Sequence, residues 1–137
     1  MNAKALALQQ RTHTFFVRVL RYCEQLPRNT RTLRIEPQLI DSAGSTDSNY
    51  RAACRARSTA EFISKIGVAA EEADESRGWL AALLASDNGE KAESQALINE
   101  ADELTAIFVK SRKTAAARLA ERKRRERGEP KTKPERR

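Results

Sequence analysis

Residues 58–89 read STAEFISKIGVAAEEADESRGWLAALLASDNG and contain the clearest helix signals in the chain. Ser58 and Glu61 have the spacing of a capping box, in which the hydroxyl accepts the amide three residues on and the carboxylate reaches back toward the cap. Apolar residues then recur at steps of three and four, and Asp87-Asn88-Gly89 is typical of a helix end. The stretch therefore predicts one long amphipathic helix. Its apolar stripe consists of Phe62, Ile66, Ala69, Ala73, Leu80, Leu83 and Leu84, widened by Ile63, Ala70 and Trp79.

The residues before this helix predict two more helices. The first ends at Pro27, and its apolar stripe consists of Leu8, Thr12, Phe15, Val19, Tyr22, Cys23 and Leu26. Pro37 is expected at the first position of the second helix, where the missing N–H has no intrahelical partner to lose. Residues 44–48 (GSTDS) are poor helix formers in sequence and leave room for a kink there.

A fourth helix is expected after Gly89, because apolar residues again alternate at steps of four and three, as in a bundle partner. Its seam consists of Leu97, Ala101, Leu104, Phe108, Ser111, Ala115 and Leu119. Four helices with short links predict an all-α fold, an antiparallel up-and-down four-helix bundle. We expect the bundle to occupy residues 1–119. Residues 120–137 are expected to form a disordered basic extension, because no large aliphatic or aromatic residue follows Leu119.

The composition limits the class of protein. The 137 residues fit one domain, and 22 of them are alanines, which bury little area each, so self-association would stabilise the bundle. No apolar run approaches the roughly 20 residues that cross a bilayer, and the N-terminus has no secretory signal pattern. Cys23 and Cys54 are too far apart for a CxxC motif. We therefore expect a cytoplasmic protein whose cysteines are small buried side chains.

The net charge of +7 is the sum of unlike segments. Residues 1–109 hold 13 basic and 15 acidic residues, whereas residues 110–137 hold 13 basic and 4 acidic ones. Such a basic segment can bind nucleic-acid phosphates in a salt-sensitive way, and no aromatic residue follows Phe108 to stack on bases. A disordered, solubilising end explains the same residues equally well. Attraction to a membrane surface is the weakest of the three alternatives, because it needs an apolar face.

Several short motifs resemble one known family. They are Gln38-Leu39-Ile40, Ser42-Ala43, Asn49-Tyr50-Arg51, residues 60–66 (AEFISKI), residues 71–76 (EEADES) and Trp79-Leu80. Together they resemble the four-helix bundle proteins of the 23S rRNA intervening sequence family. The resemblance implies a small four-helix bundle that assembles as a homopentameric ring and has no enzymatic activity. It also implies a relation to nucleic-acid-binding accessory partners of reverse transcriptases in diversity-generating retroelements.

The second helix departs from the family pattern. The family usually has a basic residue before the Ser-Ala pair, where this chain has Asp41. The stretch Gly44-Ser45-Thr46-Asp47-Ser48 likewise replaces the usual sequence. Any contact that depends on the missing basic residue is therefore not expected here, whereas the packing stripes of the other helices are intact.

No set of residues predicts catalysis, a metal or a cofactor. His13 is the only histidine, so neither a zinc-binding cluster of histidines nor the Glu-x-x-His pairs of di-iron bundles can form. The acidic residues near the middle of the third helix are instead expected to be solvated or to pair with arginines of the first helix, in the same chain or in another subunit. The acidic group is Glu71, Glu72 and Glu75, and the arginines are Arg11, Arg18 and Arg21.

Four residues are expected to have structural roles. Asn49 is expected to pair with Glu72 and fix the register of two helices through a buried polar contact. Trp79 would bury its ring in the core or in a subunit interface, with its indole N–H bonded. Phe62 belongs to the core-facing stripe.

The sequence thus predicts a non-enzymatic, homo-oligomeric bundle, a pentamer by the resemblance, that binds RNA or DNA through basic surfaces. Its other expected partner is an RNA-processing enzyme, a reverse transcriptase or another protein. The expected nucleic-acid-binding residues are Arg11, Arg18, Arg21, Lys110, Arg112, Lys113, Arg118, Arg122, Lys123, Arg124, Arg125 and Arg127. The alternative is a structural or protein-interaction module without a nucleic-acid role, whose acidic residues 58–109 would dock a basic partner.

Overall fold

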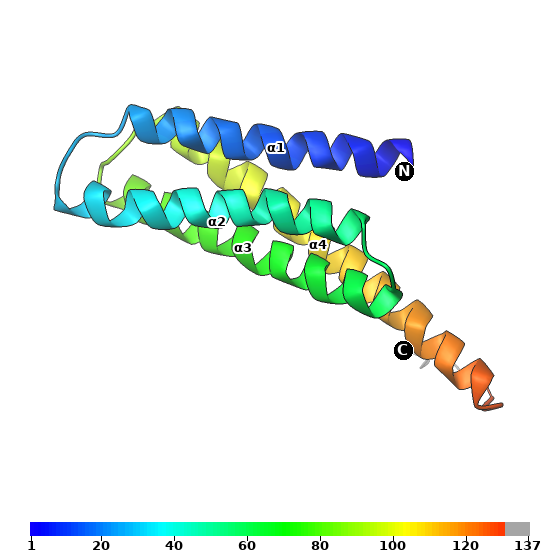
Figure 1. Cartoon of the computed structure of the whole chain (residues 1–137). Helices are drawn as coiled ribbons and strands as arrows, with labels where there is room; N and C mark the ends of the chain where they lie inside the picture. The colour runs from blue at the N-terminus through cyan, green and yellow to red at the C-terminus, as the bar shows by residue number, and fades with distance from the viewer. Residues whose placement is uncertain (131–137) are drawn as a thin grey trace.

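Four helices make up the fold of the computed structural model, which describes residues 1–130 (Figure 1). They are α1 (Ala3–Glu24), α2 (Thr30–Cys54), α3 (Thr59–Ala85) and α4 (Lys91–Glu126). Successive helices run antiparallel and are joined by short loops (Figure 1). Residues 1–130 contain no strand. The predicted all-α, up-and-down four-helix bundle is confirmed.

Side-chain caps begin the helices. Ser58 Oγ accepts the N–H of Glu61 at 3.0 Å, as the predicted capping box requires. The Glu61 carboxylate accepts the N–H of Arg57 at 3.4 Å, one residue before the cap. At α4 the carboxylate of Glu90 accepts the N–H groups of Ala92 and Glu93. Each cap satisfies amides that have no partner within the helix.

The start of α2 differs from the prediction, because the helix begins at Thr30 and Pro37 lies inside it. Asn29 forms a reciprocal capping box with Thr32, which starts the helix seven residues before Pro37. The missing N–H of Pro37 would have bonded to the carbonyl of Leu33, and both residues are exposed. Water can therefore satisfy that carbonyl, and the helix tolerates the proline.

The predicted weak stretch 44–48 is helical, and α2 is continuous through it. The Thr46 hydroxyl donates a hydrogen bond to the backbone carbonyl of Ser42, one turn earlier in the helix, at 2.8 Å. Gly44 lets α1 approach, because a Cβ there would lie 3.1 Å from the ring of Phe16. Packing against α1 therefore compensates for the low helix propensity of these residues.

The core lies between the four stripes that the sequence predicts. Large side chains from every helix are fully buried, and Tyr50 of α2 stacks on Phe108 of α4 with ring centroids 5.3 Å apart. The largest buried side chains are Phe15, Phe108, Leu39, Ile66, Leu80, Leu83, Leu97 and Leu104. Both cysteines are free; Cys23 is buried and Cys54 is half-buried. Burial raises the pKa of the Cys23 thiol to about 12, so it stays protonated as a core side chain.

Polar contacts tie α2 to its neighbours inside this core. Ser42 of α2 and Ser76 of α3 are bonded through their hydroxyl groups at 2.8 Å. On the other side of α2, Thr12 of α1 donates its hydroxyl to Asp47 at 3.0 Å. All four side chains are buried, so each contact satisfies groups that would otherwise be costly to desolvate.

Helix α4 continues as a helix to Glu126, seven residues past Leu119, where the bundle was expected to end. Residues 115–126 are almost entirely alanine, arginine, lysine, glutamate and leucine, which are the best helix formers. Basic residues in the last turn also favour the negative end of the helix dipole, and Gly128 ends the helix with a φ of 72°. Residues 120–126 are therefore helical, and part of the expected extension, residues 131–137, lies outside the described residues.

Candidate nucleic-acid interface

The C-terminal half of α4 carries the densest cluster of cations in the described chain. Between residues 110 and 127 there are nine basic residues and two acidic ones. Because these positions lie at all angles around a helix of 3.6 residues per turn, the cations surround it and form no single stripe. Seven of the nine are exposed, whereas Arg112 and Arg124 are half-buried. The exposed ones are Lys110, Lys113, Arg118, Arg122, Lys123, Arg125 and Arg127.

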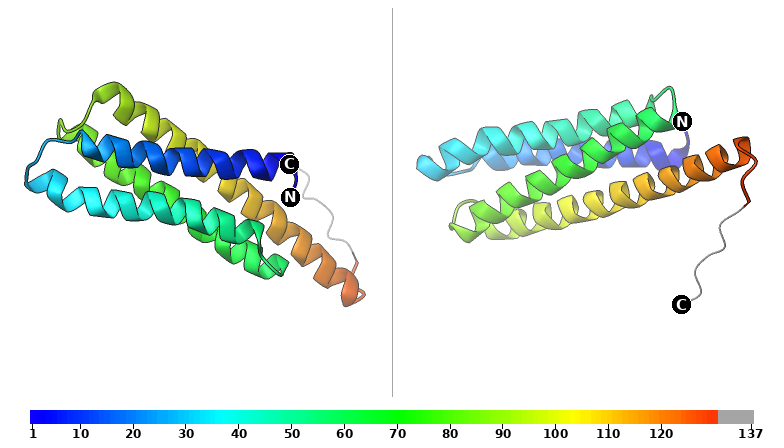
Figure 2. Two further views of the ribbon diagram at one scale, coloured as in Figure 1. Left: turned by 45° about the horizontal axis from the view of Figure 1, so that its top comes forward. Right: turned by 90° about the horizontal axis from the view of Figure 1, so that it is seen from below.

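The last turns of α4 extend past the ends of α1, α2 and α3 (Figures 1 and 2). Arg122 donates to the Thr59 hydroxyl at 3.3 Å, exposed Arg125 lies 3.5 Å from an oxygen of half-buried Glu121, and Arg127 pairs with Glu129 at 2.9 Å. Arg124 also pairs with Glu121. Exposed ion pairs along one helix are worth only tenths of a kcal/mol. A polyanion can therefore compete for these cations at small cost.

Arg11 and Arg18 of α1, which the sequence placed in the same interface, are engaged with α4. Arg11 pairs with Glu100 and, at 2.8 Å, with Glu103. The hydrogen bond that Arg11 donates to Glu100 is the main reason that the Arg11 pKa is raised. Neither arginine pairs with the α3 carboxylates of the same chain, so of the expected alternatives for those carboxylates the ion pairs with Arg11 and Arg18 within one chain do not form.

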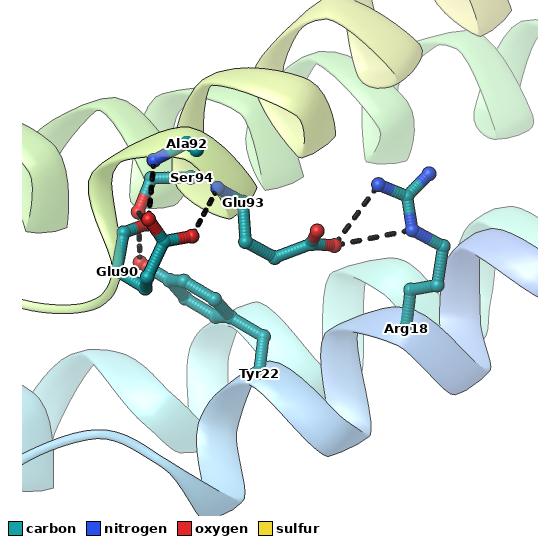
Figure 3. Close-up of polar contacts among 6 residues, drawn as sticks. All are labelled: Arg18, Tyr22, Glu90, Ala92, Glu93 and Ser94. Carbon is teal, nitrogen blue, oxygen red and sulfur yellow. Dashed lines mark hydrogen bonds and ion pairs between the residues drawn. The ribbon is translucent and has the colours of Figure 1, made fainter.

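Arg18 donates to Glu93 through Nε at 3.1 Å and through a terminal nitrogen at 2.9 Å (Figure 3). The Glu90 carboxylate beside it caps α4, and the two backbone N–H groups that it accepts lower its pKa. Among residues 1–130, Arg21 has no carboxylate partner and is exposed. Of the three α1 arginines, Arg21 alone keeps its charge available for a phosphate.

The predicted pairing of Asn49 with Glu72 is wrong. The Asn49 side chain donates within α2, to the carbonyl and the hydroxyl of Ser45, both at 2.9 Å. Glu72 is half-buried on α3 near Glu71 and Glu75. Desolvation is the main reason that its pKa is raised, and these neighbouring carboxylates add to the shift.

Replacing Glu72 with glutamine is expected to raise the melting temperature at pH 7 and to leave it unchanged well below pH 4. A carboxyl with a raised pKa stabilises the fold only while protonated, and that contribution is lost as the pH rises through the folded-state pKa. Glutamine resembles the protonated form at every pH. Thermal melts of wild type, Glu72→Gln and the exposed control Asp41→Asn across this pH range test the expectation, and equal shifts for both variants would contradict it.

The two aromatic residues predicted to be structural are half-buried and pack against the core. Phe62 lies near the start of α3. Trp79 lies near its end and donates its indole N–H to Glu75 at 3.3 Å. The indole N–H thus has a partner, as expected. Within this single chain the Trp79 ring packs against the core, which is one of the two expected positions, the other being a subunit interface.

Asp47 is the polar residue that the sequence interpretation missed. Its side chain is only 2% exposed, and it accepts from Thr12, while His13 Nδ1 and Arg51 lie 3.3 and 3.4 Å from it. The available signal was its position, four residues after buried Ala43 and three before buried Tyr50 on the core side of α2. The cluster holds α1 against α2.

Two other features, a metal site and a membrane-spanning helix, are absent from residues 1–130. No group of three acidic, histidine or cysteine side chains there is arranged to hold a metal ion. In the same part of the chain, no helix has an apolar stretch of the length that a bilayer crossing requires.

Comparisons with known proteins agree with the fold. The family model described as "23S rRNA-intervening sequence protein" matches residues 4–110. A crystal structure of a protein of unknown function from the S23 ribosomal protein family of Bacteroides thetaiotaomicron is similar, with a TM-score of 0.73 and 24% identity. The match covers 80% of this chain and 98% of that one. No curated protein matches the chain. Because the family model spans most of the residues, the chain belongs to the 23S rRNA-intervening sequence protein family.

Proposed function

We propose that this protein is a non-enzymatic, homo-oligomeric bundle that binds duplex RNA or DNA through the C-terminal half of α4. The observation that carries the proposal is a helical segment that holds eight cations and two carboxylates between residues 110 and 126, with Arg127 as a ninth cation at its C-cap. At 1.5 Å per residue this segment is about 27 Å long, and a duplex presents a phosphate charge about every 1.7 Å along its axis. Several cations can therefore meet phosphates at once.

The segment favours the backbone over the bases. No aromatic residue follows Phe108, so the helix lacks the rings that stack on unpaired bases. Flexible lysine and arginine side chains on all sides of a helix contact phosphates without selecting a sequence. Binding with little sequence preference follows from these two features.

Assembly would multiply the effect of each helix. A homo-oligomer, pentameric as the family resemblance implies, would present several copies of the segment, and their weak contacts would combine through effective concentration. A small core rich in alanine is also consistent with stabilisation by association. In the cytoplasm such an assembly would serve an RNA-processing or reverse-transcribing partner as an accessory nucleic-acid-binding protein.

Replacing Lys113, Lys123 and Arg125 with glutamine is expected to weaken duplex binding by roughly 100-fold near 0.15 M salt, if each cation neutralises one phosphate. All three are exposed, and glutamine is a good helix former, so the fold should be retained. Fluorescence anisotropy with labelled duplex RNA and duplex DNA measures the affinity.

The matched control replaces Arg28, Arg31 and Arg34 with glutamine. These exposed cations lie at the α1–α2 loop and the start of α2, and the net charge falls by the same amount. The control variant is expected to bind like the wild type. Equal weakening of both variants would show an effect of net charge alone and would count against an interface on α4.

A further inference from the structure

Helices α1 and α4 diverge at the end of the bundle opposite the α3–α4 loop (Figures 1 and 2). Near that loop they are joined by Tyr22–Ser94 and Arg18–Glu93. Toward the other end of the bundle, Arg11 forms ion pairs with Glu100 and Glu103 of α4. Beyond this point the apolar stripes of both helices continue, and Leu8 packs against the edge of the core. Leu8 of α1 and Leu119 of α4 are half-buried, and Leu6 is 50% exposed.

An open groove of about 1220 Å³ lies between the diverging helices. One wall is the start of α1, and the other is residues 107–122 of α4. Tyr50, Ala53 and Cys54 of α2 and Phe62 of α3 line it between the walls. The volume exceeds the roughly 300–1,000 Å³ of small-molecule pockets, and the α4 wall is about 22 Å long. The groove therefore has the length of about four helical turns of polypeptide.

The charge of the groove is of one sign. Six of its lining residues are basic and none is acidic: Lys4, Arg11, Arg57, Lys110, Arg118 and Arg122. Among residues 1–130, Lys4, Lys110 and Arg118 have no carboxylate partner within the ion-pair distance of 4.0 Å. An apolar floor between unpaired cations is complementary to a segment that is apolar on one face and acidic on its flanks.

We propose that this groove binds an acidic amphipathic helix of a partner protein, with apolar side chains on the floor and carboxylates against the flanking lysines and arginines. The end of this chain is a poor occupant, because residues 131–137 carry four basic residues and one acidic one. Nucleic acid is also poorly suited, since Tyr50 is buried against Phe108 and Phe62, the other ring that lines the groove, is half-buried at the edge of the core, so neither ring is free to stack on a base. The groove shares Lys110, Arg118 and Arg122 with the α4 segment of the proposed function, but Lys113, Lys123 and Arg125, which the duplex-binding test replaces, do not line it. Peptide binding and duplex binding can therefore fail independently.

A designed peptide tests the proposal on the full chain. The probe is a labelled helix of about four turns with leucines at i, i+3, i+4 and i+7 and glutamates elsewhere, compared with a scrambled peptide of the same composition. Ala115→Arg fills the groove and keeps its charge positive, whereas Ala117→Arg adds the same charge on the exposed outer side of α4. We expect the designed peptide to bind Ala115→Arg at least about 10-fold more weakly than wild type or Ala117→Arg. Duplex affinity should not fall in either variant.

Three results would overturn the proposal. One is equal affinity for the designed and scrambled peptides, and another is equal affinity of wild type and Ala115→Arg for the designed peptide. The third is a wild-type oligomer, seen by sedimentation, that Ala115→Arg dissociates, because a second copy of the chain would then occupy the groove. Weaker peptide binding by Ala115→Arg alone, with an unchanged mass, supports a partner helix in this groove.

Discussion

The substitution Gly89→Ala is expected to lower the free energy of unfolding by about 3 kcal/mol. Gly89 has a φ of 82°, a conformation that costs a residue with a side chain roughly 1–2 kcal/mol. A Cβ at this position would also lie 2.2 Å from the Tyr22 hydroxyl oxygen and 2.7 Å from the ring carbon that bears it. The buried ring would have to move and give up its 2.8 Å hydrogen bond with Ser94.

Urea unfolding followed by circular dichroism measures this loss. Gly78→Ala is the matched control, because Gly78 lies within α3 and a Cβ there would meet nothing within 4 Å. That control should be stabilised by about 0.5–1 kcal/mol through helix propensity. An unfolding midpoint for Gly89→Ala equal to that of the wild type would show that the α3–α4 loop does not depend on Tyr22.

Duplex affinity of the wild type is expected to fall by roughly 1,000-fold when salt rises from about 50 to about 200 mM, for about six phosphates neutralised. The physical reason is the release of condensed counterions, about 0.9 per phosphate on a duplex. Nine cations between residues 110 and 127 are enough to supply six contacts. Anisotropy titrations at several salt concentrations give the slope of log affinity against log salt. We expect a slope of about −5. A protein that instead recognised bases by stacking would show a much shallower slope.

Much of the fold could be predicted because burial imposes a period on the sequence. The stripe of α3, its Ser58 cap and its stop at residues 87–89 all follow from local chemistry, and the structure confirms them. The start of α2 could not be found in this way. Its capping box has Thr32 at the position where Glu or Gln is usual, so the motif is hard to recognise in the sequence. Pro37 is typical of a first helical position, and it fits inside the helix only because the Leu33 carbonyl that it leaves unbonded belongs to an exposed residue.

Cross-helix partners were harder to predict than helices. The stripes show which face of each helix is buried but not how adjacent helices are rotated and shifted along their axes. Arg11 was therefore expected near the α3 carboxylates, whereas the antiparallel register with α4 brings it to Glu100. The same limit applies to Asn49, whose nearest acceptors are in its own helix at Ser45.

The candidate interface was visible in the sequence as charge, but not as shape. The count of cations between residues 110 and 127 needs no structure. The sequence did not indicate that α4 carries these cations as far as Glu126, because the apolar seam stops at Leu119 and helix propensity without packing is a weak signal. The groove depends on where α1 and α4 part, which only the tertiary arrangement shows.

The salt dependence of duplex binding by three proteins distinguishes an interface on α4 from a general effect of net charge. The proteins are the wild type, the variant with Lys113, Lys123 and Arg125 changed to glutamine, and the control with Arg28, Arg31 and Arg34 changed to glutamine. If α4 is the interface, the slope of log affinity against log salt becomes shallower by about 2.7 in the first variant and stays unchanged in the control. Identical slopes for all three proteins would contradict an interface on α4.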